Sequence, residues 1–103
     1  MYQIRFYVPE THLEEVKNSL FVAGAGKIGN YSCCSWQTKG EGQFLAQAGS
    51  KPYLGEIDKI ERVTEYKVEL VCDKKHIKKA IAALKSSHPY EQPAYGVIKL
   101  ADF

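Results

Sequence analysis

The feature that most constrains the fold is a strand pattern followed at once by a helix pattern, which occurs twice along the chain. Over residues 2–8, apolar and polar side chains alternate with the period of two that is typical of a half-buried strand. After Pro9, the residues Leu13, Val16 and Leu20 follow at helical spacing. Alternation returns over residues 62–72, and a second helical stripe follows it, made of Ile77, Ala80, Ile81 and Leu84.

The ends of both helices carry recognisable signals. Thr11 and Glu14 have the spacing of a capping box, so we expect a helix over about residues 12–22, with Gly24 just beyond its end. Asp73 is suited to cap the second helix, and Pro89 must end it because proline cannot continue a helix.

The middle of the chain predicts shorter strands. Residues 31–38 read as a strand, residues 39–42 as a Gly-rich turn, and residues 43–47 as a short return strand. Residues 48–61 contain glycine and proline and predict a loop, which at this length is often functional or covered by a partner. A final strand is expected over residues 95–100.

Taken together, the elements predict an α+β fold of the ferredoxin-like βαββαβ type. In this fold, two helices cover one face of an antiparallel sheet. The chain has 103 residues, with 45% hydrophobic and 25% charged, which are ordinary values for one globular domain. We therefore expect residues 1–103 to form a single domain.

Charge and composition exclude several classes of function. The formal net charge is only +2, so no strong field recruits nucleic acid, and no apolar run is long enough to cross a membrane. Three cysteines, two of them adjacent, do not make a disulfide framework. The sequence thus favours a cytoplasmic protein that binds neither nucleic acid nor membrane.

Residues 24–29 match the string G-x-G-x-x-G, but their context differs from that of a dinucleotide site. Such a fingerprint leaves a strand and opens a helix, whereas these glycines close a helix and lead into a strand. We expect Gly26 and Gly29 to serve the backbone at positive φ and expect neither NAD nor ATP to bind. Backbone N–H groups that could hold an anion remain an alternative.

Cys33 and Cys34 fall in the expected strand of residues 31–38 and should point to opposite faces of the sheet, so they cannot chelate together. Cys34 shares a face with Trp36 and is expected to pack as a small apolar residue. Cys33 is then the exposed thiol.

The remaining polar candidates are histidines and lysines. His12 and His76 are expected to be solvated. The second helix carries Lys74, Lys75, Lys78, Lys79 and Lys85, which predict a solvated face, with an acidic partner or a phosphate as the alternative.

His88 lies in a different setting, the segment 88–93 with the sequence His-Pro-Tyr-Glu-Gln-Pro. Its two prolines fix φ and hold the preceding residues extended, so this corner is stiff without regular secondary structure. An imidazole and a carboxylate three residues apart could contact a metal or a polar ligand. The alternative is a purely structural corner in which Tyr90 packs on the sheet.

Two segments resemble a known family. Residues 26–36 (GKIGNYSCCSW) with residues 40–44 (GEGQF) are similar to the start of a domain inserted into many Nif-three-like proteins, which are also described as homologues of a second type of GTP cyclohydrolase I. Residues 88–95 (HPYEQPAY) are similar to the closing signature of that insert, here in a free-standing chain. Gln92 and Gly96 stand where the family signature carries acidic residues.

The resemblance implies a PII/CutA-like fold that assembles as a homo-oligomer, with a trimer favoured, and sometimes holds ligands between subunits. It does not imply cyclohydrolase activity, because the two-metal site of the host family is built from flanking halves. We therefore expect a non-catalytic module that senses a small ligand or a metal, or docks on a partner. The alternative is a small metal-dependent hydrolase that uses His88 and Glu91 at a subunit interface.

The expected ligand site combines the corner with the first signature. We expect one concave surface, near a subunit boundary, to be lined by His88, Tyr90, Glu91, Asn30, Tyr31 and Ser32. No catalytic residue is assigned. A divalent metal is the one cofactor considered, with its ligands left open.

Overall fold

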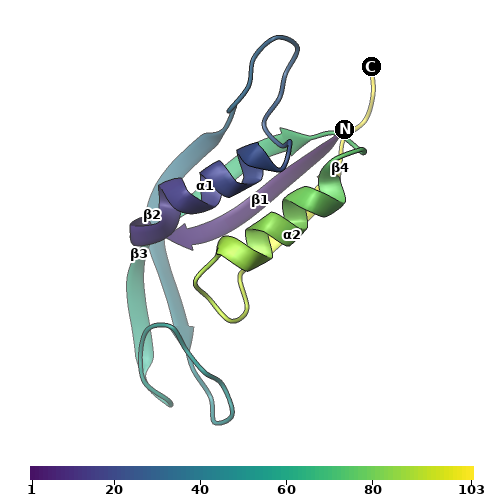
Figure 1. The fold of residues 1–103 in the computed structure, drawn as a ribbon. Coiled ribbons are helices and arrows are strands. Elements are labelled where there is room, and N and C mark those ends of the chain that lie inside the picture. Colours follow the sequence, from purple (N-terminus) through teal and green to yellow (C-terminus); the bar gives the residue numbers. More distant parts are fainter.

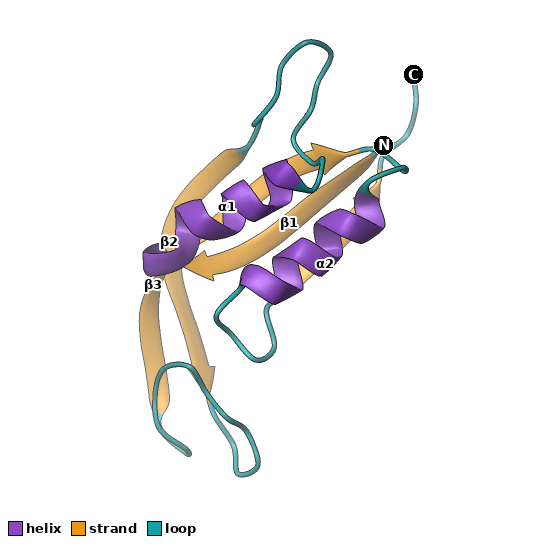
Figure 2. Ribbon diagram, viewed as in Figure 1, coloured by secondary structure: helices purple, strands orange, loops and turns teal.

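The computed structural model describes residues 1–103 and contains one antiparallel sheet with two α-helices on one of its faces (Figures 1 and 2). The strands lie in the order β2-β3-β1-β4. This order confirms the α+β, ferredoxin-like fold that the sequence predicts. In chain order, the elements are β1 (Tyr2–Pro9), the short 3-10 helix η1 (Glu10–His12), α1 (Leu13–Val22), β2 (Trp36–Leu45), β3 (Ile60–Cys72), α2 (Ile77–Ser87) and β4 (Tyr95–Lys99).

The core lies between the sheet and the two helices. Strand β1 is central because it pairs with both β3 and β4, so that Ile4 lies opposite Leu70 on one side and Val97 on the other. The alternating apolar residues of β1 and β3 face the helical stripes, as their periodicity predicts. The largest fully buried side chains include Ile4, Phe6, Val8, Val16, Leu20, Val68 and Leu84.

The helix ends agree with the sequence in part. Asp73 does not cap α2 as expected, because α2 begins at Ile77 and its N-cap position is held by His76, without a side-chain cap. Oδ1 of Asp73 instead accepts a hydrogen bond of 2.9 Å from the backbone N–H of His76 and so closes the turn that precedes α2. Gly24 follows α1 with φ of +108°, as a C′ glycine does. The predicted capping box is wrong. The η1 turn shifts the start of α1, and the Thr11 hydroxyl instead pairs with Nδ1 of His12 at 2.9 Å.

Strand β2 differs from the prediction. Residues 39–42 are not a turn, because β2 runs unbroken through both glycines, pairing Gly40 with Glu65 and Gly42 with Val63. The expected strand over residues 31–38 also begins late, since only Trp36 and later residues pair with β3. The string Lys-Gly-Glu-Gly has the composition of a turn, but both of its glycines lie within a paired strand, where the missing side chain leaves room on the face of the sheet.

The cysteines are also placed differently from the prediction. Cys33 and Cys34 lie in the connection between α1 and β2, where Cys33 has a φ of +57°, so the alternation argument does not apply to them. Cys34 is half-buried, and Trp36 is exposed rather than packed. Gly26 and Gly29 have positive φ, as expected, at +78° and +56°. Only Cys72 is buried, and burial raises the pKa of its thiol.

The β2–β3 hairpin extends beyond the rest of the sheet. Pro9 ends β1 opposite Glu65, so residues 60–64 of β3 pair only with residues 41–45 of β2. These two segments and their connection, residues 46–59, are called the arm below. The arm makes the molecule elongated, with extents of 46 × 24 × 24 Å (Figure 1). Neither helix has the length and hydropathy that a membrane span requires.

Candidate functional site

A pocket of about 450 Å³ lies at the base of the arm. Three segments far apart in sequence form its walls: residues 43–47 at the end of β2, residues in the range 50–54 of the arm's connection, and residues 90–94 after α2. Tyr7 and Glu65 complete it from the sheet. About half of the lining is hydrophobic, including several aromatic rings, and the polar groups are carboxylates, amides and hydroxyls. This composition is typical of a small-molecule site.

Tyr90 is the central side chain of the pocket. Its hydroxyl donates a hydrogen bond of 2.7 Å to Oε2 of Glu65, and its ring lies 6.0 Å from that of Phe44 and 6.3 Å from that of Tyr53 (centroid to centroid). Burial, followed by the bond to Glu65, holds the pKa of Tyr90 well above its ordinary value of 10. Tyr90 therefore stays protonated and serves as a hydrogen-bond donor.

Glu65 owes its position to Gly42. The Glu65 carboxylate lies against the Cα of Gly42 on the neighbouring strand, so closely that a Cβ at residue 42 would overlap Oε1 of Glu65. A glycine within a strand often marks such a close approach. Gly40, two residues earlier on the same face of β2, has open space above it. Gly42 thus allows the carboxylate to lie flat on the sheet and meet Tyr90.

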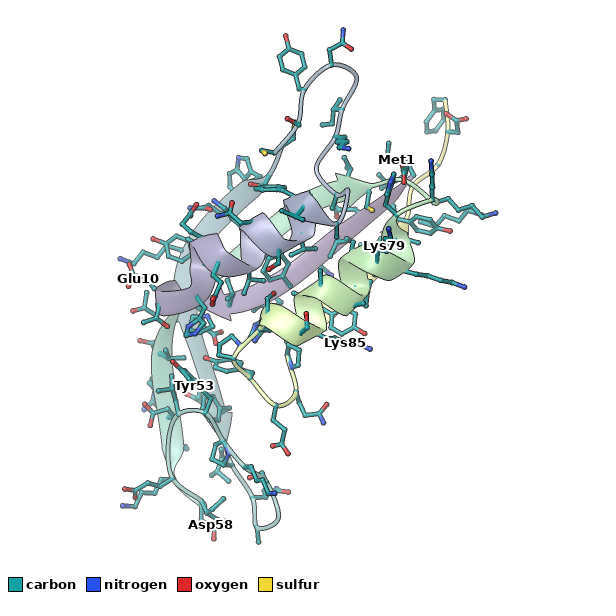
Figure 3. The ribbon with its side chains drawn as sticks, viewed as in Figure 1. Met1, Glu10, Tyr53, Asp58, Lys79 and Lys85 are labelled. Carbon is teal, nitrogen blue, oxygen red and sulfur yellow. The ribbon has the colours of Figure 1, made fainter.

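Glu91 ties the corner to the arm. Its Oε2 accepts a hydrogen bond of 3.0 Å from the backbone N–H of Lys51. Residues 88–93 and the connection of the arm are therefore held together by Glu91, and by the contact between the rings of Tyr90 and Tyr53. Tyr53 also packs edge-on against His12 at 5.5 Å, and Figure 3 shows Tyr53 at the base of the arm.

His88 holds the corner from inside. It is only 6% exposed; its Nε2 lies 2.7 Å from the carbonyl oxygen of Tyr7, and its Nδ1 accepts a hydrogen bond of 3.1 Å from the backbone N–H of Tyr90. Because a carbonyl can only accept and an N–H can only donate, the ring is neutral with its proton on Nε2. Burial accordingly lowers the pKa of His88 below 6.5. Both ring nitrogens are occupied within the chain, so His88 is not available to a ligand or metal here.

The other two histidines are half-buried, not solvated as expected. His12 packs on Tyr53, and Nδ1 of His76 lies 2.7 Å from Oδ1 of Asp73. The hydrogen bond to His76 lowers the pKa of the exposed Asp73 carboxyl. The side chain of His76 also occupies the space beside Gly24, where a Cβ would collide with it. Both histidines therefore pack against other parts of the chain.

Asn30, Tyr31 and Ser32 do not join this pocket. They are exposed in the connection between α1 and β2, which lies at the opposite end of the sheet from the corner (Figure 1). The topology requires this separation, because α1 returns the chain to the end where β1 begins, whereas α2 returns it to the end where β1 finishes. Within one chain, therefore, the two signatures do not share a surface.

The structure adds pocket residues that the sequence reasoning missed: Glu65, Phe44 and Tyr53. The signal that could have indicated the first of these is the glycine within a β-strand at residue 42. No group of three or more His, Cys, Asp or Glu side chains is close enough to hold a metal ion. The pocket therefore offers hydrogen bonds and aromatic surface, without a metal-ligand set of its own.

Comparisons with known proteins identify relatives of this chain. No protein-family model matches it. It is 45% identical over 94 residues to the GTP cyclohydrolase 1 type 2 homolog of Mycobacterium bovis, an alignment that covers 91% of this chain and 25% of the relative. The chain thus spans about a quarter of the length of the curated relatives it matches.

Solved structures agree with these relatives. A Bacillus cereus protein related to NIF3 matches with a TM-score of 0.82 at 39% identity, covering 98% of this chain and 26% of that one. CutA1 from Pyrococcus horikoshii matches with a TM-score of 0.70 at 18% identity, covering 100% of this chain and 86% of that one. At 18% identity, the second match shows the fold alone. The resemblance to Nif-three-like proteins and the CutA-like fold are both confirmed.

Proposed function

Since this chain is homologous to a quarter-length segment of the GTP cyclohydrolase 1 type 2 homologues and has a CutA-like fold, we propose that it is a non-catalytic module that binds a small molecule in the pocket at the base of the arm. The observation that carries this proposal is the preformed pocket itself. Tyr90, Glu65 and Glu91 are fixed around it by hydrogen bonds within the chain. Fixed polar groups in an aromatic wall are what selective small-molecule binding requires.

The side-chain chemistry of the pocket supports binding rather than catalysis. Catalysis by a nucleophile requires a base in hydrogen-bond contact with it and a third group that orients the base. The buried imidazole of His88 uses both nitrogens on the backbone, and the hydroxyl of Tyr90 stays protonated. The alternative of a metal-dependent hydrolase that uses His88 and Glu91 is therefore disfavoured, because His88 has no free lone pair for a metal.

Assembly into a homo-oligomer, with a trimer favoured, is the second part of the proposal. The helices cover only one face of the sheet, and the uncovered face carries Trp36, which is 64% exposed, and the exposed Ile98. The arm exposes Leu45 and Ile60 and leaves one edge of β3 unpaired over residues 60–64. A two-stranded hairpin with apolar surface is marginally stable alone, which favours a covering subunit.

A matched pair of variants tests the pocket. Ala94 lines the pocket with an exposed side chain, so Ala94→Leu should fill part of it without removing core contacts. Ala82, on the exposed side of α2, provides the control Ala82→Leu. A library of small metabolites would be screened by thermal shift, with hits confirmed by calorimetry. We expect hits that bind wild type and Ala82→Leu equally and Ala94→Leu at least tenfold more weakly. A library without hits, or hits that bind Ala94→Leu unchanged, would contradict the assignment.

The oligomer is tested separately by light scattering after size-exclusion chromatography. We expect a mass of three chains at tens of micromolar protein. Trp36→Glu places a charge on the uncovered sheet face and should shift the mass toward one chain, whereas Tyr31→Glu, on an exposed residue outside the sheet, should not. A wild-type monomer would refute this part of the proposal and leave the pocket assignment standing.

A further inference from the structure

We propose that the pocket selects an organic cation, namely an ammonium or guanidinium group carried on an apolar or aromatic body. This inference rests on the proposed function and specifies the chemical class of its ligand. It follows from the charges that line the pocket, from the free oxygens of its carboxylates and from its aromatic walls.

All formal charges that line the pocket are negative. Glu65 and Glu91 contribute carboxylates, and no lysine, arginine or histidine is among the lining residues. The five ion pairs of the chain lie elsewhere, and none of them neutralises either carboxylate. A cation in the pocket would meet two uncompensated negative charges, while an anion would be repelled by both.

Each carboxylate also has an oxygen that is free to accept. Oε2 of Glu65 is bonded to Tyr90, and Oε2 of Glu91 is bonded to Lys51, but no hydrogen bond within the chain reaches Oε1 of either residue. An ammonium group has three donors and a guanidinium group has five, so either can satisfy such acceptors. Hydrogen bonds between a cation and a carboxylate are about twice as strong as neutral ones.

The remaining walls fit the rest of such a ligand. The rings of Phe44, Tyr53 and Tyr90 lie within 6.3 Å of their neighbours, centroid to centroid, and form a small aromatic cluster beside the carboxylates. Aromatic rings attract organic cations through their quadrupole and also pack against apolar groups. A bare metal ion would use neither property, and no set of metal ligands is present.

Three probes of similar shape separate the classes of ligand: phenethylamine is a cation, 2-phenylethanol is neutral, and 3-phenylpropanoate is an anion. Binding would be followed by chemical-shift changes of the amide resonances of the full chain. We expect phenethylamine to bind with a dissociation constant in the millimolar range and to shift residues 43–47 and 90–94. The other two probes should bind at least about tenfold more weakly, since each lacks the charge-assisted bond.

Isosteric variants locate the charge. Glu65→Gln keeps an acceptor for Tyr90 and should weaken phenethylamine binding about tenfold. Glu91→Gln, at an exposed position, keeps an acceptor for the backbone N–H of Lys51 and should also weaken it. Glu69→Gln is the control, because Glu69 lies on the same strand and the same face as Glu65 but outside the pocket.

The outcomes distinguish this inference from the proposed function. If the neutral or the anionic probe binds as tightly as phenethylamine or more tightly, the inference of a cationic ligand is refuted, while the pocket is still a ligand site. The inference of a cationic ligand is also refuted if phenethylamine does not bind although the metabolite library yields other ligands whose binding is weakened by Ala94→Leu. If neither experiment finds a ligand, both proposals fail. If Glu65→Gln instead dissociates the oligomer, the occupant is a cationic side chain of a second copy, which would also refute a small-molecule cation.

Discussion

Replacing Gly42 with alanine should destabilise the protein, whereas the same change at Gly40 should not. Both glycines lie on β2, two residues apart and on the same face of the sheet. A Cβ at residue 40 meets no atom within 4 Å, but a Cβ at residue 42 would overlap the Glu65 carboxylate. The two substitutions therefore make the same chemical change on the same face of one strand, and only the one at residue 42 collides with Glu65.

The expected magnitudes follow from two terms. Alanine in place of glycine within a strand gains about 0.5–1 kcal/mol, because the unfolded chain loses conformational freedom. At residue 42, the flexible Glu65 side chain can rotate away, but it then loses its 2.7 Å bond to Tyr90. A hydrogen bond to a charged group contributes about 1.5–3 kcal/mol, with the lower limit expected for a half-exposed carboxylate. The two variants should thus differ by about 1.5 kcal/mol in unfolding free energy, or roughly 6–12 °C in Tm.

Urea unfolding at one fixed protein concentration measures this difference, since assembly would otherwise change the apparent stability. Tyr90→Phe removes the hydroxyl that donates to Glu65, so a double-mutant cycle isolates the bond. In the Tyr90→Phe background, Gly42→Ala and Gly40→Ala should have nearly the same effect. If Gly42→Ala is as harmful in that background as in the wild-type protein, the cost is steric, and the role assigned to the Glu65–Tyr90 bond is wrong.

Two further predictions concern titration and thiol reactivity. The pKa of His88 is lowered below 6.5 by burial, so its contribution to stability is complete above that pH and is lost as the pH falls toward the folded-state pKa, because protons then bind preferentially to the unfolded chain. Unfolding free energies measured between about pH 7.5 and about pH 5.5 should fall more steeply for wild type than for His88→Gln, and equal slopes would contradict the buried neutral imidazole. Maleimide should label Cys33 rapidly and Cys34 more slowly, while Cys72 should react only on unfolding; mass spectrometry that finds Cys72 labelled in the native protein would refute its place in the core.

The sequence by itself determined the fold class and the core. Apolar residues that alternate strictly, as in residues 2–8 and in the later part of β3, lie on one buried face only if the segment is a strand. The apolar stripes of α1 and α2 lie on one face only if those segments are helices. Those patterns are local, because each depends on the period of one element. They were sufficient to place Ile4, Phe6, Leu70 and Leu84 in the core, and family motifs pointed to the correct relatives.

The candidate site was decided by the tertiary structure. Glu65 and Tyr90 are 25 residues apart and meet only because β3 pairs with β1 and the corner after α2 is held at the end of β1 by the contact between His88 and the carbonyl of Tyr7. The sequence predicted a turn at Gly42 and left His88 open between a ligand contact and a structural corner. Composition does not reveal what a glycine leaves room for or which backbone groups an imidazole will meet. A pocket between distant segments is set by strand order and register, and these arise when separate elements pack together.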